Sequence, residues 1–322
     1  MASEASRRRF SPLTRPGRYW ILRAGVLAAG LLSLSALAFV AICEYRNSRD
    51  QTFPTDAEVR SSWARAAIWI LSHREQVMND DNAMLWLFVR EAGRASGDER
   101  LSSLFGEYLA KQPDTSIWRY VFDPDERGAA LLIDFPDSFP DYNRFFVYGA
   151  TCNATARADP AVVALLEPSA CGSTVSGLRN PWCRTHQLMG LRFVQKSRCE
   201  PEDVTARTVA HVQDGIAAEL AWDFRVQDAY IQKVMMLMES GRRTAVKAVW
   251  LRQILNGQGA DGGWDGMDRI TPLSGNRALY WADGRLYPRV LEQRPSNFHA
   301  TAQALYLLAL WLQRADTTGP WS

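Results

Sequence analysis

Apolar residues recur along most of the chain at the three- and four-residue spacing that places them on one face of an α-helix. Polar residues that can begin a helix precede two of these segments: Asp80, Asp81 or Asn82 before one, and Ser296 or Asn297 before the last. Strand-like alternation is scarce, and 265–295 is predicted to be irregular. The pattern predicts an all-α fold with helices over 57–77, 84–92, 101–109, 185–195, 204–222, 226–238, 244–255 and 298–312.

An uncharged apolar run, 24–43, differs from all of these segments. Its 20 residues would span about 30 Å as a helix, which is one hydrocarbon thickness. Only Arg46 and Arg49 follow it within ten residues, whereas six arginines precede it, and this bias predicts a cytoplasmic N-terminus. The six are Arg7, Arg8, Arg9, Arg15, Arg18 and Arg23.

We therefore predict a basic cytoplasmic segment, 1–23, and a transmembrane helix, 24–43, that anchors the chain in the inner membrane. A cleaved signal peptide ending near Ala36-Leu37-Ala38 is the alternative, although the apolar run continues beyond that point. After a polar linker, 44–56, residues 57–322 are predicted to form one extracytoplasmic domain. Within it, 113–182 is rich in Pro, Gly, Asp and Ser and is predicted to be a loop-rich insertion.

The charge balance argues against a nucleic-acid partner. The first 23 residues hold six of the 37 basic residues and one of the 35 acidic ones, so the rest carries 31 and 34. A near-neutral domain lacks the basic surface that phosphate backbones require.

Four cysteines follow the apolar run: Cys152, Cys171, Cys183 and Cys199. An even number in an exported domain predicts two disulfides, for which three pairings exist. We favour the sequential pairing, Cys152 with Cys171 and Cys183 with Cys199. Zinc is the alternative, but the spacings lack a Cys-x-x-Cys pair.

The stretch 247–264 carries the most specific pattern in the chain. An amphipathic helical segment ends at a glycine-rich turn, in which Gln258 is followed by Gly262-Gly263-Trp264. The pattern resembles the QW repeat of squalene–hopene and related triterpene cyclases. The Gln258 amide is expected to close the open end of one helix, with the Trp264 ring packed over that amide.

This resemblance implies an α/α toroid, a ring of helix pairs that triterpene cyclases share with the β subunits of protein prenyltransferases. Residues 298–312 look like an inner helix of such a ring, and 63–70 weakly repeats the pattern of 247–254. The resemblance covers 247–312, and elsewhere only helicity agrees with it.

The reaction motifs of these families are missing. The chain has no DxDD acid motif, and Asp123-Pro-Asp-Glu126, the nearest sequence, is better suited to capping a helix. Asp80-Asp81 lacks the third acid of a DDxxD diphosphate site. His299 stands where a prenyltransferase places a zinc ligand, but no cysteine lies in 200–322 to supply the Asp-x-Cys thiolate.

A candidate catalytic group consists of His186, His211, Asp214 and His299. His211 and Asp214 lie three residues apart on one predicted helix, so the carboxylate could orient the imidazole for general-base or metal-binding chemistry. The alternative is that each histidine bonds locally within a helical core. The sequence names no cofactor or metal.

The missing motifs favour a binding domain for an apolar, glycan or peptide ligand. The alternative is an enzyme with a His and carboxylate site, which either modifies isoprenoids or acts on envelope polysaccharide.

Overall fold

The computed structural model describes residues 16–122, 135, 139–174, 176–223, 228–266, 269–274, 277–282, 285–290 and 296–316. The chain divides into two compact units, Met1–Tyr45 and Arg46–Ser322. The predicted acidic turn at 123–126 lies outside the described residues.

The N-terminal unit contains most of one long helix, α1 (Pro16–Ser48). Most of its apolar side chains, including those of Trp20, Leu27 and Leu37, are exposed. The helix is long and apolar enough to cross a membrane, as the sequence predicts.

The helix continues to Ser48, so the first five residues of the predicted linker, 44–56, are helical. Asn47, the second residue of the C-terminal unit, is fully buried. Its amide donates to the carbonyl of Asp223 at 2.7 Å, and its Oδ1 accepts from Gln253 at 3.1 Å. Its own carbonyl accepts from the indole of Trp250 at 2.9 Å. A polar residue that looked solvent-exposed in the sequence is therefore a buried hydrogen-bonding centre of the C-terminal unit.

The first helices of the C-terminal unit begin and end at residues suited to those positions. Thr55 caps α2 (Asp56–Ser72) in a reciprocal box with Glu58. The predicted 57–77 helix is interrupted at His73, after which a single turn, α3 (Arg74–Val77), follows. Asn82 caps α4 (Ala83–Ser96), which ends at Gly97 with a positive φ of 67°.

Further helices follow after Gly97. Residues 113–182, predicted to be loop-rich, contain several short helices, and the longest of them, α7, is largely buried. The helices after α4 are α5 (Glu99–Lys111), α6 (Ile117–Phe122), α7 (Asp141–Thr151), α8 (Ala154–Arg157), α9 (Pro160–Leu166), α10 (Ser176–Arg179), α11 (Cys183–Ser197), α12 (Glu202–Trp222), α13 (Asp228–Glu239), the 3₁₀ turn η2 (Arg243–Ala245), α14 (Ala248–Asn256) and α15 (Phe298–Asp316).

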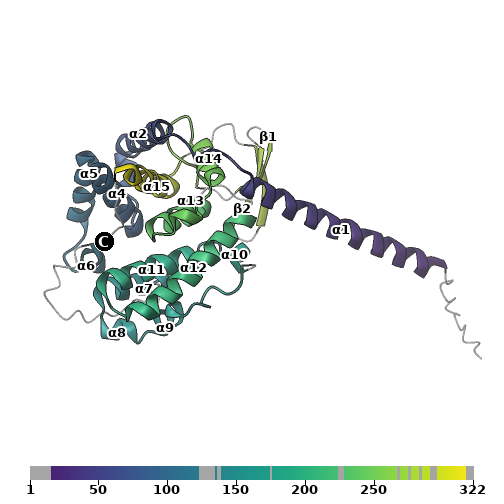
Figure 1. Ribbon diagram of the computed structural model, residues 1–322, viewed down its shortest axis with the longest axis horizontal. Helices are drawn as coiled ribbons and strands as arrows, with labels where there is room; N and C mark the ends of the chain where they lie inside the picture. Colours follow the sequence, from purple (N-terminus) through teal and green to yellow (C-terminus); the bar gives the residue numbers. More distant parts are fainter. Residues whose placement is uncertain are drawn as a thin grey trace, which may run out of the picture. The chain divides into compact units, whose positions relative to one another are not determined.

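The last helix occupies a central place in the C-terminal unit. Figure 1 shows α15, in yellow, beside α2, α4 and α13, all of which pack against it. Helix α11 packs against α7, α12 and α13. Indole rings of Trp69, Trp86, Trp250 and Trp264 are fully buried in the core between these helices. The helical fold predicted from the apolar spacing is therefore confirmed.

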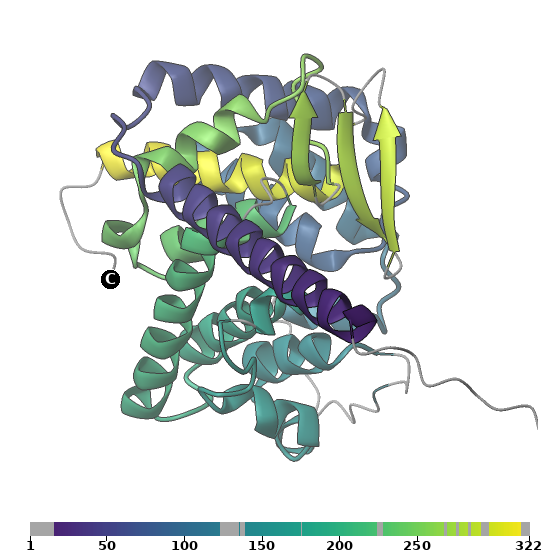
Figure 2. The ribbon, with the colours of Figure 1, turned by 90° about the vertical axis from the view of Figure 1, so that its right-hand side faces the viewer.

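The segment predicted to be irregular, 265–295, contains three short antiparallel strands (Figure 2). They are β1 (Arg269–Ser274), β2 (Arg277–Ala282) and β3 (Arg285–Val290). The β2–β3 register pairs Tyr280 with Tyr287. The strand sequences RITPLS, RALYWA and RLYPRV do not alternate strictly between apolar and polar residues, and two of them contain proline. The pattern that predicts a strand is therefore missing from this segment.

Both disulfides form, but the favoured pairing is wrong. Cys152 bonds to Cys199, and Cys171 bonds to Cys183. Cys152 directly follows the end of α7, and Cys199 lies just beyond the end of α11. Since α7 and α11 pack together, helix packing rather than sequential order along the chain decides which sulfur atoms meet.

The Gln258–Trp264 turn is ordered, but Gln258 is not the residue that closes the helix end, contrary to the sequence prediction. The indole of Trp264 donates to the carbonyl of Ile254 at 2.8 Å and thereby satisfies an acceptor in the last turn of α14. The amide nitrogen of Gln258 donates to the carbonyls of Gly262 at 2.7 Å and Ser62 at 2.8 Å. Gln258 therefore fastens the turn to α2, and Trp264 closes the helix end.

Gly262 is required by this turn for two reasons. Its φ of 97° lies in the left-handed region, which strains side chains. A Cβ at this position would also lie 2.6 Å from the carbonyl oxygen of Arg65. Gly263 is similarly enclosed, because an added Cβ would lie 2.5 Å from the Ser296 side chain.

Candidate functional site

A small pocket of about 180 Å³ lies at the N-terminal ends of several helices in the C-terminal unit. Asn82 stands at the start of α4, Tyr142 at the start of α7 and His186 in the first turn of α11. Asp228 begins α13, and His299 is the second residue of α15. Helix N-termini carry partial positive charge, so the pocket combines that field with two imidazoles and one carboxylate.

His299 and Asp228 form a close polar contact in this pocket. The imidazole Nδ1 lies 2.6 Å from Oδ1 of Asp228. Burial lowers the pKa of His299, but the hydrogen bond that the imidazole donates to Asp228 and the charges of Asp228 and Asp80 outweigh it, so the net shift is upward. A carboxylate on Nδ1 fixes that nitrogen as the donor and directs the reactive lone pair to Nε2.

His186 faces the same pocket in a different electrostatic state. Its Nδ1 lies 2.8 Å from the carbonyl oxygen of Trp182, and its ring stacks near Tyr142 with centroids 4.3 Å apart. Burial is the main cause that lowers the pKa of His186 to about 4. The nearby His299 charge lowers it further. His186 is therefore neutral at pH 7, which suits a hydrogen-bonding or ligand-binding role.

The other two predicted site residues lie elsewhere. His211 and Asp214 are exposed on α12 and do not line this pocket. Asp214 pairs with Arg242 at 2.7 Å, so the carboxylate that the i,i+3 spacing assigned to His211 orients a guanidinium instead. The structure therefore does not bring His211 and Asp214 to His186 and His299, because the buried face of α12 is formed by other residues, including Val212 and Ile216.

Asp228 was not among the residues predicted for the site. Its position in the first turn of a predicted helix could have pointed to it. That position, however, suits a helix cap as well as a carboxylate that faces a neighbouring helix. Only the packing of α13 against α15 decides between the two.

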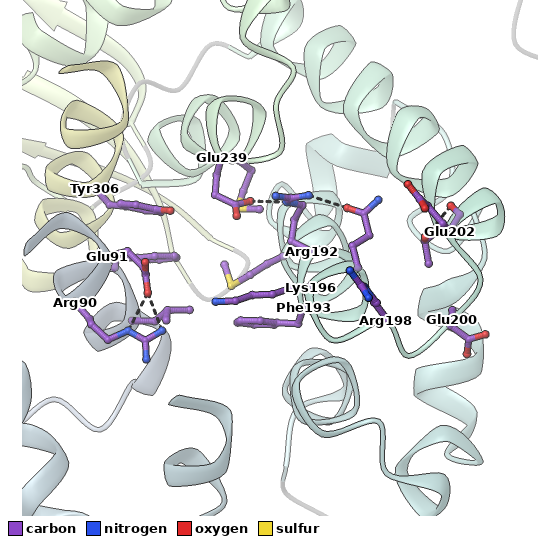
Figure 3. A pocket seen from close by; sticks show the side chains of 16 residues that line it. Arg90, Glu91, Arg192, Phe193, Lys196, Arg198, Glu200, Glu202, Glu239 and Tyr306 are labelled. Carbon is purple, nitrogen blue, oxygen red and sulfur yellow. Dashed lines mark hydrogen bonds and ion pairs between the residues drawn. The ribbon is translucent and has the colours of Figure 1, made fainter. Parts of the chain in front are cut away.

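A larger cavity of about 670 Å³ adjoins this pocket, and Phe88 lines both. Figure 3 shows side chains from α4, α11, α13 and α15 pointing toward one another across it. Its charged lining is balanced, with four basic residues, Arg90, Arg192, Lys196 and Arg198, and four acidic ones, Glu91, Glu200, Glu202 and Glu239. None of these residues was singled out in the sequence, although Glu91, Arg192 and Glu239 all adjoin apolar helical runs.

Ion pairs neutralise several of these charges. Arg192 pairs with Glu239 at 3.2 Å, and Arg90 pairs with Glu91 at 2.7 Å (Figure 3). Burial is the main cause that raises the pKa of Glu239, with Glu91 adding to the shift and Arg192 opposing it. Burial together with Glu239 and Glu91 also raises the pKa of Tyr306 well above its ordinary value, so its hydroxyl stays protonated. The cavity thus offers hydrogen-bond donors and acceptors with little net charge.

In the described part of the chain, no group of three or more His, Cys, Asp or Glu side chains could hold a metal ion.

No protein-family model matches the sequence, and no curated protein or solved structure matches it.

Proposed function

We propose that the C-terminal unit is an α/α toroid of helix pairs. Helices α4, α7, α11, α13 and α15 supply most of the walls of the two pockets, and these five are the inner helices of the proposed ring. The first turn of α12 adds Glu202 and Thr205 to the larger cavity. Each packs against an outer partner: α5 on α4, α9 on α7, α12 on α11, α14 on α13 and α2 on α15. Inner and outer helices then alternate along the chain, and contact between α15 and α4 joins the last inner helix to the first.

This unit is proposed to lie on the extracytoplasmic side of the membrane, anchored by α1. The N-terminus of the whole chain is proposed to lie in the cytoplasm. The two disulfides support an oxidising compartment. The arginine excess before the apolar run supports the orientation.

The proposed activity is binding of a neutral glycan segment in the larger cavity. The observation that carries it is the lining of that cavity, which is polar and charged yet balanced, with ion pairs such as Arg192–Glu239 in its wall. A volume of about 670 Å³ falls within the ~300–1,000 Å³ typical of small-ligand sites. An apolar ligand would strip water from these charges without replacing its hydrogen bonds.

Among polar ligands, a neutral polyhydroxylated one fits best. Its hydroxyl groups can donate to Glu91 and Glu239 and accept from Arg192 without separating the existing pairs. A charged peptide would have to compete with those pairs. The rings of Phe193 and Tyr306 add apolar faces to the same wall.

The test is binding of the full-length chain, in lipid nanodiscs, to an array of neutral and acidic oligosaccharides. Affinity for the strongest neutral binder is then measured by calorimetry for the wild type, Arg192→Gln and Glu239→Gln. Loss of one charge-assisted hydrogen bond should weaken binding about tenfold or more.

Arg74→Gln is the matched control, because Arg74 pairs with Glu107 and does not line the cavity. It should bind as the wild type does. Absence of binding to every neutral oligosaccharide, or equal affinity in Arg192→Gln and Arg74→Gln, contradicts the proposal.

A further inference from the structure

We propose that the smaller pocket hydrolyses small O-acyl esters, with His299 as the general base and Asp228 as the residue that positions it. The proposal goes beyond glycan binding. It rests on the proposed function in one respect only, which is that the molecule carrying the acyl group is the glycan.

The first support is the geometry of the His299–Asp228 pair. With Nδ1 donating to Asp228 at 2.6 Å, the neutral imidazole carries its lone pair on Nε2. The side chains of His299 and Asp228 are 37% and 28% exposed, so the pair borders accessible space rather than solid core. A histidine oriented by a carboxylate in this way is the arrangement that general-base catalysis requires.

The second support is a buried amide that packs beside the imidazole of His299. Gln303 is fully buried, and its Oε1 accepts no hydrogen bond within the part of the chain that the structure describes. Its amide nitrogen lies 3.4 Å from Nδ1 of His299, one helical turn earlier, so this buried side chain helps to hold the imidazole ring in place.

The third support is a donor for the oxygen of the ester carbonyl. Asn82 lines the pocket, and its Oδ1 is occupied as the helix cap that accepts from the Met84 amide at 3.1 Å. Its amide nitrogen therefore remains to donate. The surrounding helix N-termini favour negative charge on an oxygen at this place.

The size of the pocket limits the acyl group. About 180 Å³ holds the attacking water, at roughly 30 Å³ of liquid volume, and an acyl chain of a few heavy atoms. The shared wall residue Phe88 places the adjoining cavity beside it, where the alcohol part of a larger ester can lie.

The proposed reaction balances without any further reactant. His299 Nε2 takes a proton from water as the water oxygen bonds to the acyl carbon, and the carbonyl electron pair moves to its oxygen. When the carbonyl re-forms, the bond to the alkoxy oxygen breaks, and that oxygen takes the proton from Nε2. Ester and water give acid and alcohol, and the base is restored.

The rate should depend on the protonation of His299, since only its neutral form accepts a proton. The charged or titratable groups around it are Asp228 from α13, Asp80 from the turn before α4, His186 from α11 and Tyr142 from α7. Asp228 raises the pKa of His299, so its replacement by Asn should move the midpoint of the rate profile to lower pH.

The experiment measures initial hydrolysis of p-nitrophenyl acetate by the full-length chain in nanodiscs between pH 5 and 9. The wild type should exceed the buffer rate. His299→Gln should reduce kcat about 100-fold or more, which is the usual contribution of a general base. Asp228→Asn should lower kcat and shift the pH midpoint downward, an effect that simple loosening of the fold does not produce.

His211→Gln is the matched control, because His211 is exposed on α12 and lies outside the pocket. It should retain the wild-type rate. The proposal is overturned by a wild-type rate equal to buffer, by equal rates in His299→Gln and His211→Gln, or by complete inhibition with phenylmethylsulfonyl fluoride, which would reveal a serine hydrolase contaminant. Should His299→Gln fail to fold, an unshifted pH midpoint in Asp228→Asn overturns it instead.

This outcome is separable from that of the glycan assay. Ester hydrolysis without glycan binding would leave this inference standing and refute the proposed function, and the reverse result would do the opposite.

Discussion

The indole nitrogen of Trp264 lies 2.8 Å from the carbonyl oxygen of Ile254, so the residue that ends the glycine-rich turn also closes the helix before it. Gln258 holds the other side of the turn through Ser62 and Gly262. Both side chains thus fix one turn between α2, α14 and the start of α15. This relationship gives the first prediction.

Trp264→Phe should destabilise the C-terminal unit by about 1–3 kcal/mol, because the Ile254 carbonyl loses its indole donor in a buried place. Gln258→Met should also destabilise it. The double variant should lose less than the sum, by ~0.5–3 kcal/mol, since both residues order the same turn. Urea unfolding measures the three values. Trp222→Phe, at an indole that is 49% exposed, is the control, and strict additivity of the two losses would contradict the shared role.

Asn47→Ala should destabilise the same unit by about 1–3 kcal/mol. The change leaves the buried Gln253 amide and the Asp223 carbonyl without their Asn47 partner. Urea unfolding followed by tryptophan fluorescence measures the loss. Arg49→Ala, two residues further on at an exposed position, should leave the midpoint unchanged. Equal midpoints in both variants would show that residue 47 belongs to a linker after all.

Peptide mapping without reduction should recover Cys152 linked to Cys199, and Cys171 linked to Cys183. Protein purified from its native compartment is the proper sample. Removal of either disulfide, in Cys152→Ser/Cys199→Ser or Cys171→Ser/Cys183→Ser, should lower the thermal midpoint, because each bond restricts the unfolded chain. A Cys152–Cys171 peptide would instead restore the sequential pairing.

Acid should destabilise the fold partly through His186. Its folded-state pKa of about 4 lies below its ordinary 6.5, so between these pH values the unfolded chain binds a proton that the folded chain does not. The stability contributed by His186 is therefore lost as pH falls from 6.5 toward 4. His299, whose pKa is raised, acts in the opposite direction, because its contribution is present in acid and is lost as pH rises through its folded pKa.

His186→Gln should therefore lose less stability than the wild type between pH 7 and pH 4. Urea unfolding at pH 7, 5.5 and 4 gives the comparison. His211→Gln, on the exposed face of α12, should keep the wild-type dependence. A parallel fall in wild type and His186→Gln would show that other groups cause the acid loss.

The proposed topology predicts that alkaline phosphatase fused after Ser322 is active, since that enzyme requires an oxidising compartment. A fluorescent protein that folds only in the cytoplasm should stay dark at the same position. The reverse result would place the C-terminal unit in the cytoplasm and remove the support that the disulfides give to the orientation.

The sequence alone determined the features that depend on local pattern. The apolar spacing predicted the main helices, because one buried face requires a period of about 3.6 residues. The uncharged run 24–43 predicted a helix long enough to cross a membrane. Asn82 and Asn297 could be recognised as helix caps, because capping needs only a nearby backbone amide, and both side chains accept one.

Only the tertiary structure decided which distant residues meet. His186 and His299 share a pocket because α11 and α15 begin at the same place, whereas His211 lies on the exposed face of α12. Cys152 reaches Cys199 because α7 packs on α11. Spacing along a helix specifies its faces but not the neighbour that each face meets, so the Asp228–His299 contact and the charged cavity could not be read from the chain.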